Sequence, residues 1–170
     1  MEDKALLSTE EASGAEKAEL LIVIPAYNEA ENIERVVNHL TANFPQYDYV
    51  VVNDGSRDET AAICQRNGYN LLNFPVNLGL AGAFQAGLKY ADKYGYQYAV
   101  QLDGDGQHRP EYLESMIKKM EEGYDIVIGS RFVGEKKPFT MRMLGSNLIE
   151  MAIRFTTGVN IKDPTSGMRM

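Results

Sequence analysis

The chain contains 170 residues, of which 44% are apolar, so it is long enough for one domain with a hydrophobic core. Its formal net charge of −7 argues against general binding to nucleic acid. No apolar run approaches the roughly 20 residues of a membrane-spanning helix, and the acidic amino terminus lacks the pattern of a secretory signal. One cysteine, Cys64, excludes an internal disulfide and favours a reducing, cytoplasmic location.

Charge is distributed unevenly along the chain. Residues 131–170 carry seven basic and three acidic side chains, a net charge of +4, so residues 1–130 carry −11. Two interpretations fit the basic segment. It is either a solvated surface of mixed charge, or a basic patch that binds phosphates or the anionic cytoplasmic face of a membrane.

The first predicted elements are a tail, a strand and a helix. Residues 1–19 hold six acidic side chains and few large apolar ones, which predicts a disordered tail ahead of a folded domain at 20–170. The apolar run at 20–24 predicts a strand in the middle of a parallel sheet, and Pro25 ends it. Asn28 is expected to cap the next helix. Its buried face is expected to consist of residues at helical spacing: Ile33, Val36, Val37 and Leu40.

The next unit repeats this alternation. Residues 50–52 predict a second strand, Asp58 is expected to cap a helix that ends near Gly68, and residues 70–74 predict a third strand. A helix that begins in 77–87 is unusually rich in small residues. Because glycine costs about 1 kcal/mol relative to alanine inside a helix, either the sheet or a ligand is expected to approach it closely.

The last strand–helix unit contains the central motif of the chain. A strand at 98–102 leads directly into Asp103-Gly104-Asp105, and a helix at 110–122 follows. Residues 125–131 predict another buried strand, which ends at Arg131. The alternation of strands and helices predicts an α/β fold with a doubly wound, mostly parallel sheet and helices on both faces.

Polar side chains follow the predicted strands at their carboxyl ends, where open α/β sheets bind ligands. These side chains are Asp54, Asp103, Asp105 and Arg131. Two carboxylates as close as Asp103 and Asp105 repel each other unless a cation lies between them. Mg²⁺ and Mn²⁺ prefer such oxygen ligands, so the motif predicts a divalent metal held for a phosphorylated substrate. A simple Asp-Gly turn is the alternative.

The chain changes character after Phe132. A basic loop at 136–138 precedes a predicted helix at 141–157, rich in Met, Leu, Ile and Phe. This helix is either buried against the sheet or, with its neighbouring cations, an interfacial element that serves a lipid phosphate. Residues 163–169 are rich in turn formers and show no closing element, so the domain is expected to continue past Met170.

The chain resembles the family-2 glycosyltransferases with the GT-A fold over about residues 20–170. The resemblance rests on four motifs in the family's order: Ile24-Pro25-Ala26-Tyr27-Asn28-Glu29, Val52-Asn53-Asp54-Gly55-Ser56, Asp103-Gly104-Asp105 and Gly129-Ser130-Arg131. Further stretches are similar to the dolichol-phosphate-mannose synthase branch, whose members move a sugar onto a polyprenyl phosphate: residues 77–83, Gln107-His108 and Asp163-Pro164-Thr165-Ser166-Gly167.

This resemblance implies roles for individual residues. A nucleotide-sugar donor would be bound by Pro25, Ala26, Tyr27, Glu29, Asp54, Gly79, Asp103 and Arg131. Asp54 would bind the base, with uracil or guanine preferred, and Arg131 would pair with the diphosphate. Mg²⁺ or Mn²⁺ would be held by Asp105 and Gln107. Asp103 and Asp105 would be catalytic, and Asp163 would be the candidate general base.

The resemblance also implies an inverting transfer of the sugar from the donor to an acceptor. A lipid phosphate is already ionised and needs little help from a general base, which favours a polyprenyl phosphate. A cell-envelope glycan, a soluble sugar acceptor and a non-catalytic nucleotide-sugar-binding module remain alternatives. A phosphatase that uses an aspartate nucleophile would need a further acidic pair, and only Asp163 is available.

Overall fold

The computed structural model of the chain describes residues 19–106, 108–129, 151, 154–156, 158 and 167–170. The predicted acidic tail, except for its last residue, the basic loop at 136–138 and nearly all of the predicted helix at 141–157 lie outside these residues. Three predicted site residues also lie outside them: Gln107, Arg131 and Asp163.

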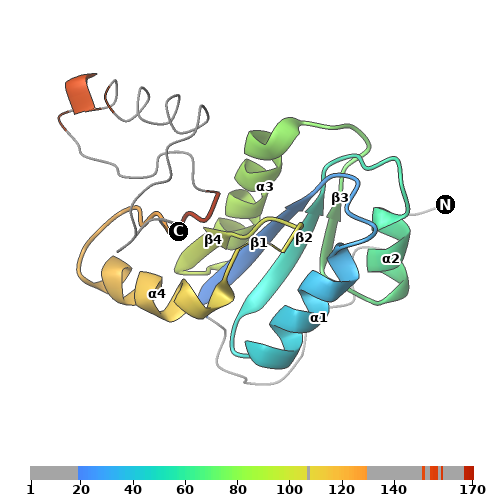
Figure 1. Ribbon diagram of the computed structural model, residues 1–170, viewed down its shortest axis with the longest axis horizontal. Coiled ribbons are helices and arrows are strands. Elements are labelled where there is room, and N and C mark those ends of the chain that lie inside the picture. Colours follow the sequence, from blue (N-terminus) through green and yellow to red (C-terminus); the bar gives the residue numbers. More distant parts are fainter. Residues whose placement is uncertain (1–18, 107, 130–150, 152–153, 157, 159–166) are drawn as a thin grey trace, which may run out of the picture.

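A parallel sheet runs through the described part of the chain. Its strands are β1 (Leu20–Ala26), β2 (Asp48–Asn53), β3 (Leu71–Asn73) and β4 (Tyr98–Gln101), in the order β3-β2-β1-β4 (Figure 1). Every residue of β1 is buried. This central strand has a neighbour on each edge, which explains why it consists of a continuous apolar run. The predicted α/β fold is confirmed.

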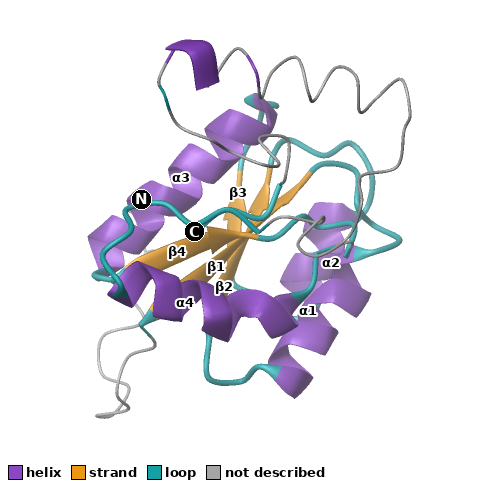
Figure 2. Cartoon of the chain, turned by 60° about the vertical axis from the view of Figure 1, so that its left-hand side comes forward, coloured by secondary structure: helices purple, strands orange, loops and turns teal. Residues whose placement is uncertain are grey.

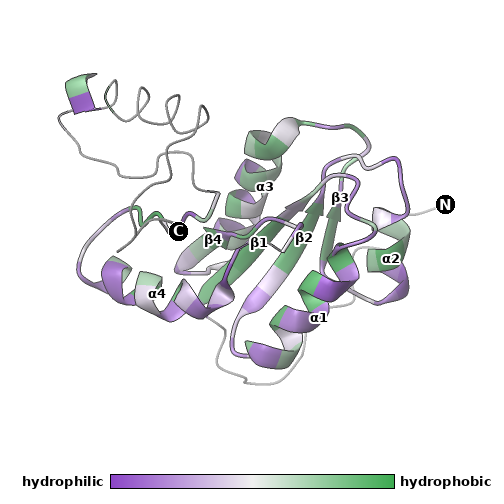
Figure 3. Cartoon of the chain, in the orientation of Figure 1, coloured by the Kyte–Doolittle hydropathy of each residue, from purple (hydrophilic) through white to green (hydrophobic). Residues whose placement is uncertain are grey.

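Helices cover both faces of the sheet. One face carries α1 (Ile33–Asn43), α2 (Thr60–Arg66) and α4 (Leu113–Glu121), which follows the short 3₁₀ helix η1 (Pro110–Tyr112). The other face carries α3 (Gly79–Tyr94), so that the sheet lies between two helical layers (Figure 2). Along β1, Leu20, Ile22 and Ile24 pack toward α1 while Leu21 and Val23 pack toward α3. Hydrophobic residues accordingly predominate along the buried strand β1 (Figure 3).

The predicted strand at 125–131 is wrong for its described residues. Residues 125–129 form no regular strand, and the side chain of Ile126 is 70% exposed. The segment joins the sheet edge through an isolated antiparallel bridge between Ile128 and Arg169. Backbone hydrogen bonds also join Val127 to Met170 and Gly129 to Met168.

The end of the chain supplies the neighbour of β4 that the sequence did not predict. Arg169 also bridges antiparallel to Gln101, so residues 168–170 lie between β4 and residues 127–129. The peptide N–H of Gln101 donates to the carbonyl of Arg169 at 2.9 Å. Met168 and Met170 are buried in the core. Buried and exposed residues alternate over only three positions here, which is too short to be recognised as a strand next to the turn formers that precede it.

The start of α1 also differs from the prediction. The helix begins at Ile33, and Asn28 does not cap it. Asn28 instead adopts a left-handed conformation with φ of 57°, and its side-chain oxygen accepts the peptide N–H of Arg57 at 2.9 Å. Asn32 occupies the capping position, but its side chain makes no capping hydrogen bond.

None of the helices in the described part of the chain combines the length and the apolar composition needed to cross a membrane.

Gly87 shows that part of the small-residue pattern in α3 serves packing against the sheet. A Cβ added at Gly87 would overlap Cγ1 of Val23, which is fully buried in β1. We expect Gly87→Ala to destabilise the protein by about 1–2 kcal/mol, because overpacking outweighs the gain in helix propensity. Urea unfolding measures this loss. The double variant with Val23→Ala removes the two clashing methyl groups, so the two substitutions should show a favourable coupling free energy. Equal stability of Gly87→Ala and the wild type would contradict this packing.

Candidate functional site

A cavity of about 320 Å³ opens at the carboxyl edge of the sheet. It collects every described residue that the sequence predicted for nucleotide binding: Pro25, Ala26, Tyr27, Glu29, Asp54, Gly79 and Asp103. Asp105 and Gly104 also line it, and Asn77, Leu80 and Ala83 complete the wall. The cavity thus places four carboxylates around one space, although they come from three separate loops.

The loop after β1 is fastened to the loop after β2. The peptide N–H of Asn28 donates to Oγ of Ser56, and that of Glu29 donates to Oγ1 of Thr60, both at 2.9 Å. The peptide N–H of Ala30 donates to the carboxylate of Asp58 at 3.0 Å. Asp58 also accepts the peptide N–H of Thr60, the first residue of α2, at 3.0 Å. The capping position predicted for Asp58 is nevertheless occupied by Glu59, whose side chain makes no capping hydrogen bond. The hydrogen bonds from Asn28, Glu29 and Ala30 hold the loop after β1, which lines the cavity, in place.

Asp54 supports another part of the cavity wall, the loop that precedes α3. Its side chain is 97% buried, and Oδ1 accepts the peptide N–H of Leu78 at 2.7 Å. Gly55 supports the same contact, since a Cβ there would lie 2.6 Å from the backbone carbon of Val76. Asp54 therefore has one oxygen committed to the loop that precedes α3. The sequence analysis expected Asp54 to bind the base and did not assign it this hydrogen bond to Leu78.

The backbone conformation of Gly79 explains another small residue in the sequence of α3. Gly79 lines the cavity with φ of 77°, and a Cβ built there would meet no other atom within 4 Å. Glycine is favoured here by the left-handed backbone at the start of α3, not by close packing. Close packing at Gly87 and backbone conformation at Gly79 are thus two separate reasons for the glycines of this helix.

Asp103 is held by side chains that the sequence analysis did not assign. The amide of Gln101, which is buried, donates to Oδ1 of Asp103 at 2.8 Å. The peptide N–H of Asp103 donates to Nδ1 of His108 at 2.9 Å. Nε2 of the neutral ring therefore carries the proton, and it lies 3.5 Å from Oδ2 of Asp103. His108 thus orients the aspartate and is not a simple loop residue.

Gly167, near the end of the chain, lies against Asp103 and His108. A Cβ at Gly167 would lie 2.7 Å from Oδ2 of Asp103 and 2.7 Å from Cε1 of His108. The glycine of the predicted turn-rich segment therefore lies directly against the first aspartate of the Asp-Gly-Asp motif. No local sequence signal indicates this contact.

The Asp-Gly-Asp loop approaches the end of β1 closely. A Cβ at Gly104 would lie 3.2 Å from the carbonyl oxygen of Pro25 and 3.4 Å from Cγ of Glu29. Within the described residues, no group of three or more His, Cys, Asp or Glu side chains could hold a metal by itself. This donor set still fits Mg²⁺ or Mn²⁺, because such ions are often held by one or two carboxylates together with substrate phosphates.

Cys64 takes no part in the site. Its side chain is fully buried in α2, and burial raises the pKa of its thiol above the ordinary value. A buried thiol of this kind is a poor nucleophile.

Known proteins are similar in sequence to this chain. The model of the family "Glycosyl transferase family 2" matches residues 21–170. The chain is 34% identical to a polyprenol monophosphomannose synthase of Mycolicibacterium smegmatis, over 88% of this chain and 60% of the relative. It is 32% identical to an undecaprenyl-phosphate mannosyltransferase of Micrococcus luteus, over 88% of this chain and 65% of the relative. The chain thus spans less than two thirds of the length of these curated relatives.

Solved structures share the fold. The glucosyl-3-phosphoglycerate synthase of Mycobacterium tuberculosis, solved with Mn²⁺, uridine diphosphate and glucosyl-3-phosphoglycerate, matches with a TM-score of 0.64 at 20% identity. The match covers 88% of this chain and 55% of that structure. At this identity the likeness shows the GT-A fold, which agrees with the parallel sheet and its two helical layers.

Proposed function

The chain belongs to glycosyl transferase family 2, and from this premise we propose that it transfers a sugar from a UDP- or GDP-sugar to a polyprenyl phosphate. The observation that carries the proposal is the cavity at the carboxyl edge of the sheet, which gathers all of the described predicted donor-binding residues. The names of the two curated relatives support this acceptor, since both refer to a polyprenyl phosphate or its sugar-linked product.

The nucleotide is proposed to lie against the end of β1. Pro25, Ala26 and Tyr27 contact the base and the ribose, and Tyr27 is suited to this because its ring is 44% exposed. Asp54 binds the base edge. Because the peptide N–H of Leu78 already occupies Oδ1 of Asp54, the other carboxylate oxygen accepts from the base. A carboxylate can only accept hydrogen bonds, so bases with a ring N–H donor, uracil and guanine, are favoured over adenine.

The diphosphate is proposed to bind beside the Asp-Gly-Asp loop. Asp105 and Gln107 would hold Mg²⁺ or Mn²⁺, and the ion would supply positive charge to the phosphate oxygens. Asp103 faces the ribose or the sugar phosphate, and Arg131 pairs with the diphosphate through its planar guanidinium. Gln107 and Arg131 lie outside the described residues, so their part in this proposal rests on the family motifs alone.

The chemistry follows from the charges. An oxygen of the acceptor phosphate forms a bond to the anomeric carbon of the sugar while the bond from that carbon to the donor phosphate breaks. The bonding electrons leave with the nucleoside diphosphate, and the configuration at the carbon inverts. A phosphate acceptor is ionised at neutral pH, so no proton has to be removed. Asp163 is the candidate base for a hydroxyl acceptor.

With a lipid phosphate as acceptor, the reaction is proposed to take place at the cytoplasmic face of a membrane. The net charge of +4 in residues 131–170 favours peripheral attraction to anionic lipid, and each cation near the surface contributes about 1 kcal/mol. The rest of the chain, at −11, opposes general adsorption. The predicted domain at 20–170 then serves as the donor-binding catalytic domain.

A transfer assay tests the function directly. We expect label to move from a UDP- or GDP-sugar to a polyprenyl phosphate in the presence of Mn²⁺, and to stay on the donor when a chelator is added. ADP-sugars are expected to be inactive because adenine lacks the ring N–H that Asp54 requires. Donor hydrolysis without transfer to lipid would move the acceptor toward a soluble sugar or a glycan. Metal-dependent binding without turnover of any donor would indicate a non-catalytic binding module.

A further inference from the structure

Arg35 contacts the Asp-Gly-Asp loop from outside the donor cavity. It belongs to the first turn of α1, and its Nη2 donates to the carbonyl oxygen of Asp105 at 3.0 Å across a sequence separation of 70 residues. The cavity lining does not include Arg35. It lines a separate hollow of about 350 Å³ on the other side of the loop, together with Gly106 and Asp103. Arg35 therefore contacts the Asp-Gly-Asp loop on the side that faces away from the donor cavity.

The backbone of the loop is shaped to receive this guanidinium. Gly106 has φ of 76°, and a Cβ there would lie 2.9 Å from both Nη1 and Nη2 of Arg35. Any side chain at Gly106 would therefore displace the arginine as well as strain the backbone. The loop is held on its other side by Gly104, which lies against the carbonyl of Pro25 and the side chain of Glu29. Between these two contacts, the peptides that carry Asp103 and Asp105 are fixed.

Asn32 connects this support to the donor cavity. Its Nδ2 donates to Oε2 of Glu29 at 2.9 Å, and its Oδ1 accepts from Nη2 of Arg35 at 3.2 Å. The orientation of the amide is determined by its partners, because a carboxylate only accepts and a guanidinium only donates. Asn32 stands at the capping position of α1 but makes no capping bond, although asparagine is among the best capping residues. Its side chain is used for the network instead.

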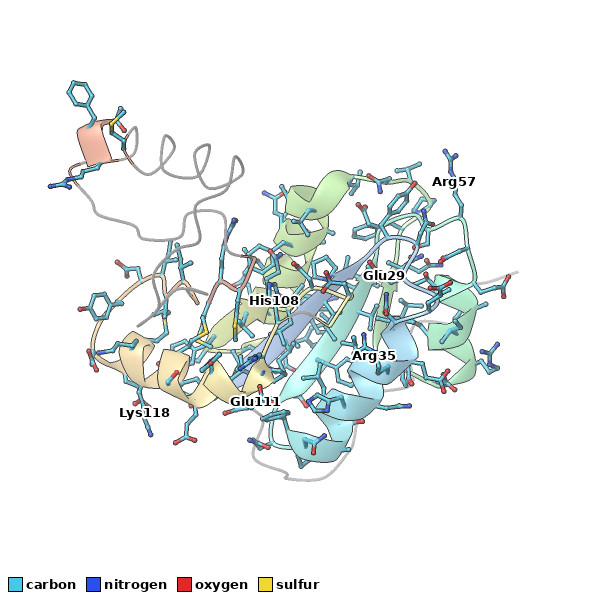
Figure 4. All side chains as sticks on the ribbon, viewed as in Figure 1. Glu29, Arg35, Arg57, His108, Glu111 and Lys118 are labelled. Atoms are coloured by element: carbon cyan, nitrogen blue, oxygen red, sulfur yellow. The ribbon has the colours of Figure 1, made fainter. Side chains whose placement is uncertain are left out.

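These contacts form one chain of hydrogen bonds from Glu29 through Asn32 and Arg35 to Asp105. Figure 4 labels Glu29 and Arg35 near each other at the start of α1. We propose that Arg35 and Asn32 are positioning residues that fix the metal-binding loop and couple it to Glu29 of the donor cavity. The inference rests on the proposed function, because it assumes that this loop holds the metal on the donor diphosphate. Neither residue lines the donor cavity.

The predicted consequence is a selective loss of metal affinity. Removing a partner that orients a metal ligand typically weakens metal binding 10- to 100-fold. Because the guanidinium is exposed, we expect Arg35→Met to weaken Mn²⁺ binding in the presence of UDP or GDP by about tenfold, the lower end of that range. Electron paramagnetic resonance of free Mn²⁺ measures this affinity, and calorimetry measures nucleotide binding with and without Mn²⁺. Metal-free nucleotide affinity should stay within about twofold of the wild type, since a shift of only the loop leaves the base pocket intact.

Two further variants separate positioning from general stability. Arg35→Lys keeps a positively charged donor but lacks the planar guanidinium whose Nη2 makes both hydrogen bonds, so it should recover part of the affinity. Asn32→Ser keeps a good capping residue while removing the link to Glu29, so it should lose Mn²⁺ affinity without losing helix stability. Arg66→Met is the matched control, because Arg66 is exposed in the last turn of α2, at the far end of that helix from the cavity.

The outcomes are distinguishable. Wild-type Mn²⁺ affinity in both Arg35→Met and Asn32→Ser would overturn the inference and leave the proposed function standing. Equal losses of metal-dependent and metal-free nucleotide binding, together with a lower melting temperature, would also overturn it in favour of a general structural role. If Arg35→Met does not fold, Arg35→Lys and Asn32→Ser decide. Absence of Mn²⁺-dependent nucleotide binding in the wild type would contradict the proposed function itself, and the inference with it.

Discussion

Replacing Asp105 with alanine is expected to abolish metal-dependent binding of a nucleoside diphosphate while the protein stays folded. Asp105 lines the donor cavity, is only half-buried and does not belong to the apolar core. Its loss removes a negatively charged ligand of Mg²⁺ or Mn²⁺ in the proposed site. Because loss of an outer-shell partner alone costs 10- to 100-fold, we expect loss of this ligand to reduce Mn²⁺-dependent affinity and transfer by about 100-fold or more.

Calorimetry with UDP and GDP, with and without Mn²⁺, measures the effect of Asp105→Ala. Asp92→Asn is the control, because Asp92 is exposed on α3 and its substitution also removes one negative charge. The control should bind as the wild type does. Unchanged nucleotide affinity of Asp105→Ala in the presence of Mn²⁺ would contradict the metal assignment. A large fall in melting temperature would show that Asp105 also supports the fold.

The strands and their ligand edge could be predicted because their signals are local. The apolar run of β1 and the motif after β4 stand out within a few residues, and parallel topology then brings Asp54, Asp103 and Asp105 to one edge. The segment at 168–170 could not be predicted in the same way. Its pairing with Gln101 and Ile128 depends on tertiary contacts, and the turn formers before it dominate the local pattern.

The residues that support the site were missed for the same reason. Arg35 is an ordinary exposed helix residue in the sequence, and only the fold brings it to a carbonyl 70 residues away. Gln101 is an isolated polar residue in an apolar strand, and this was the one available signal, because a buried amide requires a partner. The capping prediction for Asn28 was wrong because a left-handed turn precedes α1, and single-residue preferences do not reveal where such a turn lies.

Gly167→Ala is expected to disturb the donor site from a position outside the donor cavity. The added Cβ would lie within 2.7 Å of Oδ2 of Asp103 and within 2.9 Å of Nε2 of His108, so one side of the contact must move. The 168–170 side is fixed, because Met168 and Met170 are buried and the peptide N–H of Gly129 donates to the carbonyl of Met168 at 2.9 Å. The Asp103 side chain is 33% exposed and has room to move. We therefore expect the side chain of Asp103 to move.

We expect Gly167→Ala to weaken donor binding by about tenfold, as for loss of an orienting contact, with a stability loss of about 1 kcal/mol at the low end of overpacking. Calorimetry and urea unfolding measure the two effects. A double variant with His108→Ala removes the ring atoms that clash, so the affinity losses of the two substitutions should not add. Additive losses would show that the ring and the new methyl group do not meet. Unchanged donor affinity with a stability loss above about 3 kcal/mol would show instead that the 168–170 segment moves and the aspartate stays in place.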